Sequence, residues 1–246
     1  ENTAKLYTDM GVLSSNEVVG QDANDFFNYL SGYSIQPDYN HLHVSPYRIR
    51  EAFIAKIERE IKNQKLHGNG HFIAKMNSLT DKVLIQKMYE ASQVGVKIEL
   101  NIRGICCLIP GIPGVSENIA VRSIIGRMLE HSRIYYFYNN GDEELYLSSA
   151  DMMTRNMENR VEIAFPILNK EIHDIIFKTL TLFFADNTKA WELQPDGSYS
   201  QLQPGYEKPI SAQLELMKVA QSQSNRQLQQ QSSRKTWWTR LKDRFF

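Results

Sequence analysis

The sequence has little cysteine and no long apolar run. Only two of its 246 residues are cysteines, and these are the adjacent Cys106 and Cys107. Adjacent thiols disfavour both a disulfide framework and a zinc site, and they are typical of a reducing compartment. No apolar run approaches the roughly 20 residues of a membrane-spanning helix, and no signal peptide is recognisable. We therefore expect a cytoplasmic location.

The sequence also lacks an excess of either charge, since 28 Lys and Arg balance 28 Asp and Glu. Net charge therefore predicts no nucleic-acid partner, and a site for anions must be a local cluster. No initiator methionine precedes Glu1, and the residues after it are β-like. We expect that another segment precedes this chain.

The hydrophobic pattern alternates between strand-like and helix-like segments, which predicts an α/β fold with a mixed β-sheet flanked by helices. A strand over 71–76, a helix over 80–95 and a strand over 96–102 form a β-α-β unit, which implies neighbouring parallel strands. The other predicted elements are strands over 3–13, 41–44, 133–138, 144–149 and 161–165, helices over 22–30, 46–66, 116–130 and 170–184, and hairpins at 140–142 and 195–197.

Composition divides the chain into three parts. The polar segment 32–40 contains Pro37 and predicts a domain junction, so that residues 1–40 and 41–215 belong to different domains. Residues 216–246 are expected to be a disordered tail, because the Gln- and Ser-rich part from about 221 has too few apolar residues to fold alone. The end of the tail mixes cations with aromatics, and it is a solvated tail, an oligomer contact, or a segment that docks on an anionic membrane or on polyphosphate.

His131 is the histidine with the most suggestive neighbours. Imidazole titrates near neutral pH and can accept a phosphoryl group. Arg133 lies two residues further along an expected strand, so both side chains point to the same face. A guanidinium and an imidazole on one face can contact the same phosphate. A structural role for His131 remains the alternative.

Other polar residues follow or begin predicted strands. Arg103 follows the strand that ends at Ile102, and the carboxyl edge of parallel strands is where α/β sheets form ligand crevices. Arg160 and Glu162 begin another strand on a common face, and the Glu162 carboxylate is placed to orient a histidine. The pattern predicts a site for a polyanion.

Three segments of the sequence resemble motifs of bacterial polyphosphate kinases: IRGICCLIPGIPGVSENI at 102–119, LEHSR at 129–133 and YLSSAD at 146–151. The resemblance extends to about residue 215. It implies two phospholipase D-like domains that face each other across a tunnel for ATP and polyphosphate. On this basis 1–40 is the end of the first domain and 41–215 is the second.

The resemblance also implies roles for individual residues. Tyr7 resembles a tyrosine that contacts the nucleotide, and Asp9 an acid that orients the phosphorylated histidine. Arg103 and His131 resemble a nucleotide-binding pair, and Arg160 with Glu162 the arginine and acid of the second half-site. The phosphorylated histidine of an Ile-His-Ala-Lys type motif has no counterpart here, nor do the magnesium-linked positions. We expect Mg²⁺ to act in the full-length enzyme, with no metal ligands from this chain.

The sequence departs from one pattern of the phospholipase D superfamily. Phosphodiesterases of that superfamily need His-x-Lys followed by an aspartate, whereas Arg133 and Tyr138 stand at those positions. Arginine grips phosphate well but is a poor proton donor. The resemblance to polyphosphate kinases implies reversible transfer of the terminal phosphate of ATP to polyphosphate through a phosphohistidine, in a homo-oligomer that also binds ADP. The alternatives are a non-catalytic module that binds nucleotide or polyphosphate and supports assembly, and a phosphodiesterase.

Overall fold

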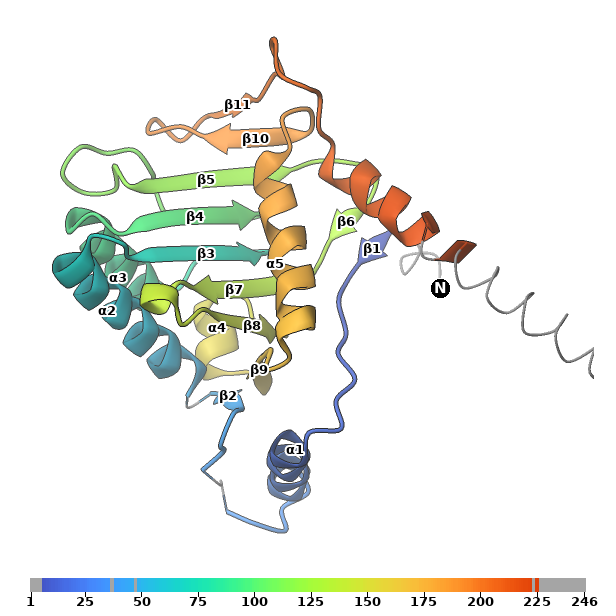
Figure 1. Ribbon diagram of the computed structural model, residues 1–246. Coiled ribbons are helices and arrows are strands. Elements are labelled where there is room, and N and C mark those ends of the chain that lie inside the picture. Colours follow the sequence, from blue (N-terminus) through green and yellow to red (C-terminus); the bar gives the residue numbers. More distant parts are fainter. Residues whose placement is uncertain (1–5, 36–37, 47, 223, 226–246) are drawn as a thin grey trace, which may run out of the picture.

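A computed structural model describes residues 6–35, 38–46, 48–222 and 224–225. Its centre is a nine-stranded mixed sheet with the strand order β11-β10-β5-β4-β3-β7-β8-β9-β2 (Figure 1). The strands are β2 (His43–Ser45), β3 (His71–Met76), β4 (Lys97–Ile102), β5 (Ile119–Ile124), β7 (Arg133–Phe137), β8 (Glu144–Ser148), β9 (Glu162–Pro166), β10 (Ala190–Leu193) and β11 (Tyr199–Gln201). The predicted α/β class is confirmed.

Parallel strands occupy the middle of the sheet. β3 and β4 are parallel and joined through helix α3 (Lys82–Gln93), as the β-α-β pattern predicted. Asp81 caps α3 by accepting a hydrogen bond from Leu84 N at 3.1 Å. β5 extends the parallel set beside β4, while β7 runs antiparallel to β3 on the other side.

The predicted helix over 116–130 is wrong, because this segment forms strand β5 and the short strand β6 (Leu129–Glu130). Ser116 does not cap a helix; its hydroxyl accepts a hydrogen bond from Ile112 N within the loop. Ile119 and Val121 are buried in the larger core cluster, and β5 has β4 as a hydrogen-bonding partner on one side and β10 on the other. Pairing with the neighbouring strands thus decides in favour of a strand where the local sequence pattern fits either a helix or a strand.

Helices cover both faces of the sheet (Figure 1). Helices α2 (Ile49–His67) and α3 lie on one face, and α5 (Lys170–Ala185) lies on the other. Ile49, Phe53 and Ile57 of α2 are fully buried in the larger core cluster. A second cluster lies beneath Ile176 and Leu180 of α5. The short helix α4 (Thr154–Glu158) follows β8.

The N-terminal part is joined to the sheet at two places. Of the predicted strand over 3–13, residues 3–5 lie outside the described part of the chain, and within 6–13 only β1 (Tyr7–Thr8) is a strand, which pairs in parallel with β6 beside the main sheet. Helix α1 (Glu17–Leu30) begins earlier than predicted, because Asn16 caps it through Val18 N and Val19 N. The buried carboxylate of Asp22 accepts hydrogen bonds from the segment 40–42.

The C-terminal part corrects the predicted tail. Residues 212–222 are helical, so the first residues of the segment predicted to be disordered are ordered. Ala212 and Leu216 pack in a small cluster with Phe183 of α5, which explains this order. The basic and aromatic end, 226–246, lies outside the described residues. Among the described helices, none has the length and apolarity to cross a membrane.

Candidate functional site

The predicted site residues gather at one edge of the sheet because of its topology. One edge of the sheet holds the ends of β3, β4 and β8 and the beginnings of β7 and β9. This follows because β3 and β4 are parallel, while β7 is antiparallel to β3 and β8, and β9 is antiparallel to β8. His131, Arg133 and Asp151 therefore meet there, and Arg103 and Glu162 follow or begin neighbouring strands. The short sheet of β1 and β6 lies against this edge (Figure 1) and adds Tyr7 and Asp9.

His131 is held by Asp9, which is 122 residues away in the sequence. Asp9 Oδ2 lies 2.7 Å from His131 Nδ1, a distance at which Nδ1–H donates to the carboxylate. The edge of the Tyr7 ring contacts the imidazole, with centroids 5.2 Å apart and an interplanar angle of 79°. The His131 side chain remains 32% exposed. In the tautomer that donates from Nδ1 to Asp9, the other ring nitrogen, Nε2, makes no contact with a carboxylate among the described residues.

The electrostatics of the cluster stabilise the charged form of Asp9. Partial burial alone would raise the pKa of Asp9, but the hydrogen bonds from His131 and Met10 N and the charges of His131 and Arg133 lower it below 3.8. Asp9 is therefore an anionic partner for His131 at neutral pH. Such a carboxylate fixes the ring orientation and stabilises an imidazolium if one forms.

Arg133 is fixed between His131 and Asp151. Its Nε and Nη2 donate to the two carboxylate oxygens of Asp151, at 3.3 and 3.1 Å. Its Nη1 donates to the carbonyl oxygen of His131 at 3.2 Å and lies 3.4 Å from each ring nitrogen. The guanidinium therefore lies against the imidazole, as the two-residue spacing predicted.

Asn77 links this cluster to Arg103. Asn77 N donates to Asp151 at 2.7 Å, and Asn77 Nδ2 donates to the carbonyl oxygen of His131 at 3.4 Å. The Asn77 carbonyl oxygen accepts from Gly104 N at 2.8 Å, and a Cβ at Gly104 would lie only 3.1 Å from that oxygen. Glycine at 104 thus permits the close approach that brings the neighbouring Arg103 to the site.

Arg103 lines a cavity and has one buried donor without a partner among the described residues. Among the described residues, no hydrogen-bond partner reaches its buried Nη1. The adjacent cavity, of about 270 Å³, is lined by Arg103, Gly104, Ser123, Ile125, Trp191 and Tyr199. The guanidinium of Arg103 places a positive charge at the wall of this cavity. Arg103 is therefore well suited to bind an anion.

Arg160 and Glu162 lie at the same edge but make different contacts. Glu162 accepts a hydrogen bond from Asn156 Nδ2 at 2.6 Å and lies 4.0 Å from Arg160 Nη1. No hydrogen bond or ion pair between described residues joins either side chain to His131. The carboxylate that contacts the histidine of this chain is Asp9, the acid that the resemblance had linked to the phosphorylated histidine.

The donors at the edge do not suit a metal ion. Within the described ranges, no three His, Cys, Asp or Glu side chains are arranged to hold one. Asp9 and Asp151 are each engaged by a histidine or an arginine. The site therefore offers cations and an imidazole, which suit phosphate rather than Mg²⁺.

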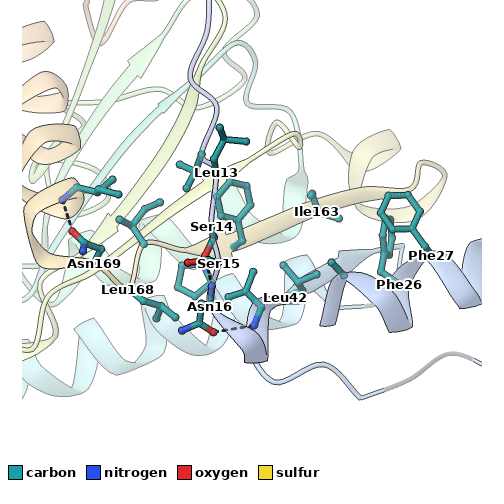
Figure 2. A pocket seen from close by; sticks show the side chains of 17 residues that line it. Leu13, Ser14, Ser15, Asn16, Phe26, Phe27, Leu42, Ile163, Leu168 and Asn169 are labelled. Carbon is teal, nitrogen blue, oxygen red and sulfur yellow. Dashed lines mark hydrogen bonds between the residues drawn. The ribbon is translucent and has the colours of Figure 1, made fainter. Parts of the chain in front are cut away.

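A larger cavity, of about 650 Å³, lies elsewhere, between the segment 12–27 and the start of α5 (Figure 2). Asn16 and Asn169 at its border cap helices through Val19 N and Ile172 N. Its lining contains aliphatic, aromatic, hydroxyl and amide side chains but no titratable one. The larger cavity thus lacks groups that could bind a phosphate through charge.

Sequence reasoning missed several residues that support the site. Asp151 ends the segment YLSSAD, but no pattern in the sequence indicates its role, nor the roles of Lys75, Asn77 and Glu130. A lysine within the apolar strand 71–76 is the one local signal, because a buried lysine needs partners. The partners themselves are far apart in the sequence, so no local pattern identifies them.

Residues 42–213 match the family model described as polyphosphate kinase C-terminal domain 2. The chain belongs to the polyphosphate kinase family. This match covers most of the chain, including every predicted site residue except Tyr7 and Asp9.

Individual polyphosphate kinases extend the comparison to the N-terminal part. The polyphosphate kinase of Bacillus cereus is 58% identical over 218 residues, which are 89% of this chain and 31% of that protein. The polyphosphate kinase of Staphylococcus saprophyticus is 49% identical over 100% of this chain and 35% of that protein. This chain spans about a third of the length of these polyphosphate kinases.

A solved structure agrees with the family assignment. The crystal structure of polyphosphate kinase from Porphyromonas gingivalis matches with a TM-score of 0.83 at 37% identity, over 86% of this chain and 33% of that one. A phospholipase D family member, Nuc from Salmonella typhimurium, is a more distant match with a TM-score of 0.46 at 12% identity.

Proposed function

We propose that this chain supplies one half of a polyphosphate kinase active site, which transfers the terminal phosphate of ATP reversibly to inorganic polyphosphate. The observation that carries the proposal is the cluster of Asp9, His131 and Arg133, with Arg103 following β4 at the same edge of the sheet. The family relationship supports phosphate as the anion that this cluster receives.

The residues divide the work in a way that their contacts support. Arg103 supplies the positive charge of its guanidinium at the same edge of the sheet, and Arg133 adds positive charge next to the imidazole. His131 presents Nε2 toward the ligand, either to accept a proton or a phosphoryl group or, when protonated, to donate a hydrogen bond. Loss of one such cation would slow transfer by on the order of 10²-fold, by analogy with the loss of an oxyanion-hole donor.

The histidine that carries the phosphoryl group is expected outside this chain. Its attack on the γ-phosphate would leave ADP, and polyphosphate would then take the group from the phosphohistidine. Mg²⁺ would be held by other parts of the enzyme, because the donor set here does not fit it. Tyr7, Arg160 and Glu162 would line the same phosphate path, while homo-oligomerisation, a cytoplasmic location and a peripheral membrane contact stay predictions.

Calorimetric titration with inorganic tripolyphosphate tests the binding part of the proposal. Arg103→Ala should weaken binding about 10-fold or more, because one charge-assisted hydrogen bond contributes about 1.5–3 kcal/mol. Lys65→Ala is the matched control, since Lys65 lies in the last turn of α2, at the opposite edge of the sheet. Equal losses in both variants, or no loss in Arg103→Ala, would contradict a phosphate site at this edge.

Incubation with γ-labelled ATP and Mg²⁺ separates catalysis from binding. The chain alone is expected to bind without becoming labelled, which agrees with a binding role that needs the rest of the enzyme. Acid-labile label that is lost in His131→Ala would instead show that His131 is itself a phosphoryl acceptor.

A further inference from the structure

A buried ion pair lies directly behind the Asp9–His131 contact and plays no part in the proposed chemistry. Lys75 Nζ is 3.3 Å from Glu130 Oε2, and the two side chains are only 2% and 5% exposed. Burying two charges is costly, so such a pair needs further hydrogen bonds or a specific purpose. Both partners contact residues that adjoin the site.

The register of β1 and β6 explains how this pair reaches the site. Thr8 is paired with Glu130, and successive side chains on a strand point to opposite faces. Tyr7 and Asp9 therefore face His131, while Thr8 and Glu130 face the other way and contact each other. Thr8 Oγ1 donates to Glu130 Oε2 at 3.0 Å.

Lys75 holds the residues on both sides of His131. Besides its ion pair with Glu130, its ammonium donates to Ser132 Oγ at 2.9 Å and to the Ser132 carbonyl oxygen at 3.2 Å. Gln213 Nε2, from the C-terminal helical segment, donates to the second Glu130 oxygen at 2.8 Å. Burial lowers the pKa of Lys75, and the charges of Glu130 and Asp9 oppose that effect.

The ladder between β1 and β6 is short enough to need this support. It pairs two residues on each strand, and the flanking backbone bonds are Leu129 N to Leu6 O and His131 N to Thr8 O. A two-stranded ladder of this size is marginal alone, and a slip of one residue would turn Asp9 away from His131.

We propose that Lys75, Glu130 and Thr8 are positioning residues for the Asp9–His131 pair: Lys75 fixes both neighbours of His131, and Glu130 fixes Thr8 between Tyr7 and Asp9. The role of this positioning in phosphate transfer rests on the proposed function, whereas the experiment that tests the positioning does not. The test uses the chain without nucleotide or phosphate, so a failure to bind tripolyphosphate and a failure of positioning are separate results.

Thr8→Val is the principal variant, because it removes the hydroxyl and keeps a β-branched side chain. Thr188→Val is the matched control: Thr188 Oγ1 donates to Ile210 O at 3.0 Å, in the part of the chain near the C-terminal helix and away from His131. Thr8→Val loses one partly buried hydrogen bond, and Thr188→Val loses the bond to Ile210 O and a longer one to Asp186 Oδ1 at 3.4 Å, so each should lower the melting temperature by about 2–4 °C.

The carboxyl ¹³C shift of Asp9, followed against pH, is the deciding readout. In Thr8→Val the pKa of Asp9 should rise toward 3.8, and the Nδ1–H proton signal of His131 should exchange faster or disappear. In Thr188→Val both should stay as in the unsubstituted chain. Lys75→Met, if it folds, should repeat the Thr8→Val result. An unchanged Asp9 titration in Thr8→Val, or an equal shift in Thr188→Val, overturns the proposal.

Discussion

Asp151→Ala should be among the most destabilising substitutions at the edge of the sheet. Asp151 is 6% exposed and accepts hydrogen bonds from two backbone N–H groups, of Asn77 and Ser78, as well as from Arg133. Its removal leaves the Arg133 charge without its carboxylate and Asn77 N–H without an acceptor. Breaking a buried ion pair costs about 3–5 kcal/mol.

The expected loss is somewhat smaller than that range. The Arg133 side chain keeps 14% exposure, so water compensates part of its charge. We expect a loss of about 2–4 kcal/mol in the free energy of unfolding, or roughly 5–15 °C in melting temperature for a chain of this size. Urea unfolding followed by circular dichroism measures it. Asp174→Ala, at a 54% exposed carboxylate on α5, is the control and should lie within about 0.5 kcal/mol of the unsubstituted chain.

A double-mutant cycle with Arg133→Met tests the reason for the loss. If an uncompensated guanidinium causes most of it, Asp151→Ala combined with Arg133→Met should lose about 1–3 kcal/mol less than the sum of the single variants. Additive losses, or an Asp151→Ala variant as stable as the Asp174→Ala control, would refute the ion pair as the anchor of Arg133.

Two further predictions concern the stability of the fold. Burial would raise the pKa of Glu144, but hydrogen bonds from Arg59 and Lys56 lower it to about 2, below its ordinary 4.5. The stabilisation that ionised Glu144 provides is therefore complete above about pH 4.5 and lost as the pH falls toward 2. Glu144→Gln should reduce the loss of unfolding free energy over this pH range by up to about 3 kcal/mol, as measured by urea titrations at several pH values. An unchanged pH dependence would contradict this. Gly70→Ala would put a Cβ 2.6 Å from the Glu60 carbonyl oxygen and should cost about 1–3 kcal/mol in thermal unfolding, whereas Gly20→Ala in α1 meets no atom within 4 Å and should be neutral or stabilising. Similar effects at both glycines would show that this contact is not responsible.

The parts of the fold that sequence predicted are those with strong local signals. The strand over 71–76 and the helix after Asp81 carry apolar runs, a cap and a glycine end, and the structure keeps them nearly as predicted. The segment 116–130 lacks such a decisive signal, because its apolar residues fit a helix or a strand. Its place between β4 and β10 decides in favour of a strand, and no local pattern contains that information.

The candidate site shows the same division. The spacing of His131 and Arg133 predicted that the two side chains lie together, because this depends only on alternation along an extended segment. The Asp9 contact depends on the register of β1 with β6, across 122 residues. The ion pair of Lys75 with Glu130 depends on how β3 packs behind that register, so it appears only in the folded chain.

The most direct test of a phosphate site at this edge is a nuclear magnetic resonance titration of the labelled chain with inorganic tripolyphosphate. We expect the ring signals of His131 and the guanidinium signals of Arg103 and Arg133 to shift together and to saturate at one concentration. Lys65 in α2, at the opposite edge, should not follow them. A titration that shifts other cations while His131 and Arg103 stay unchanged would contradict the account.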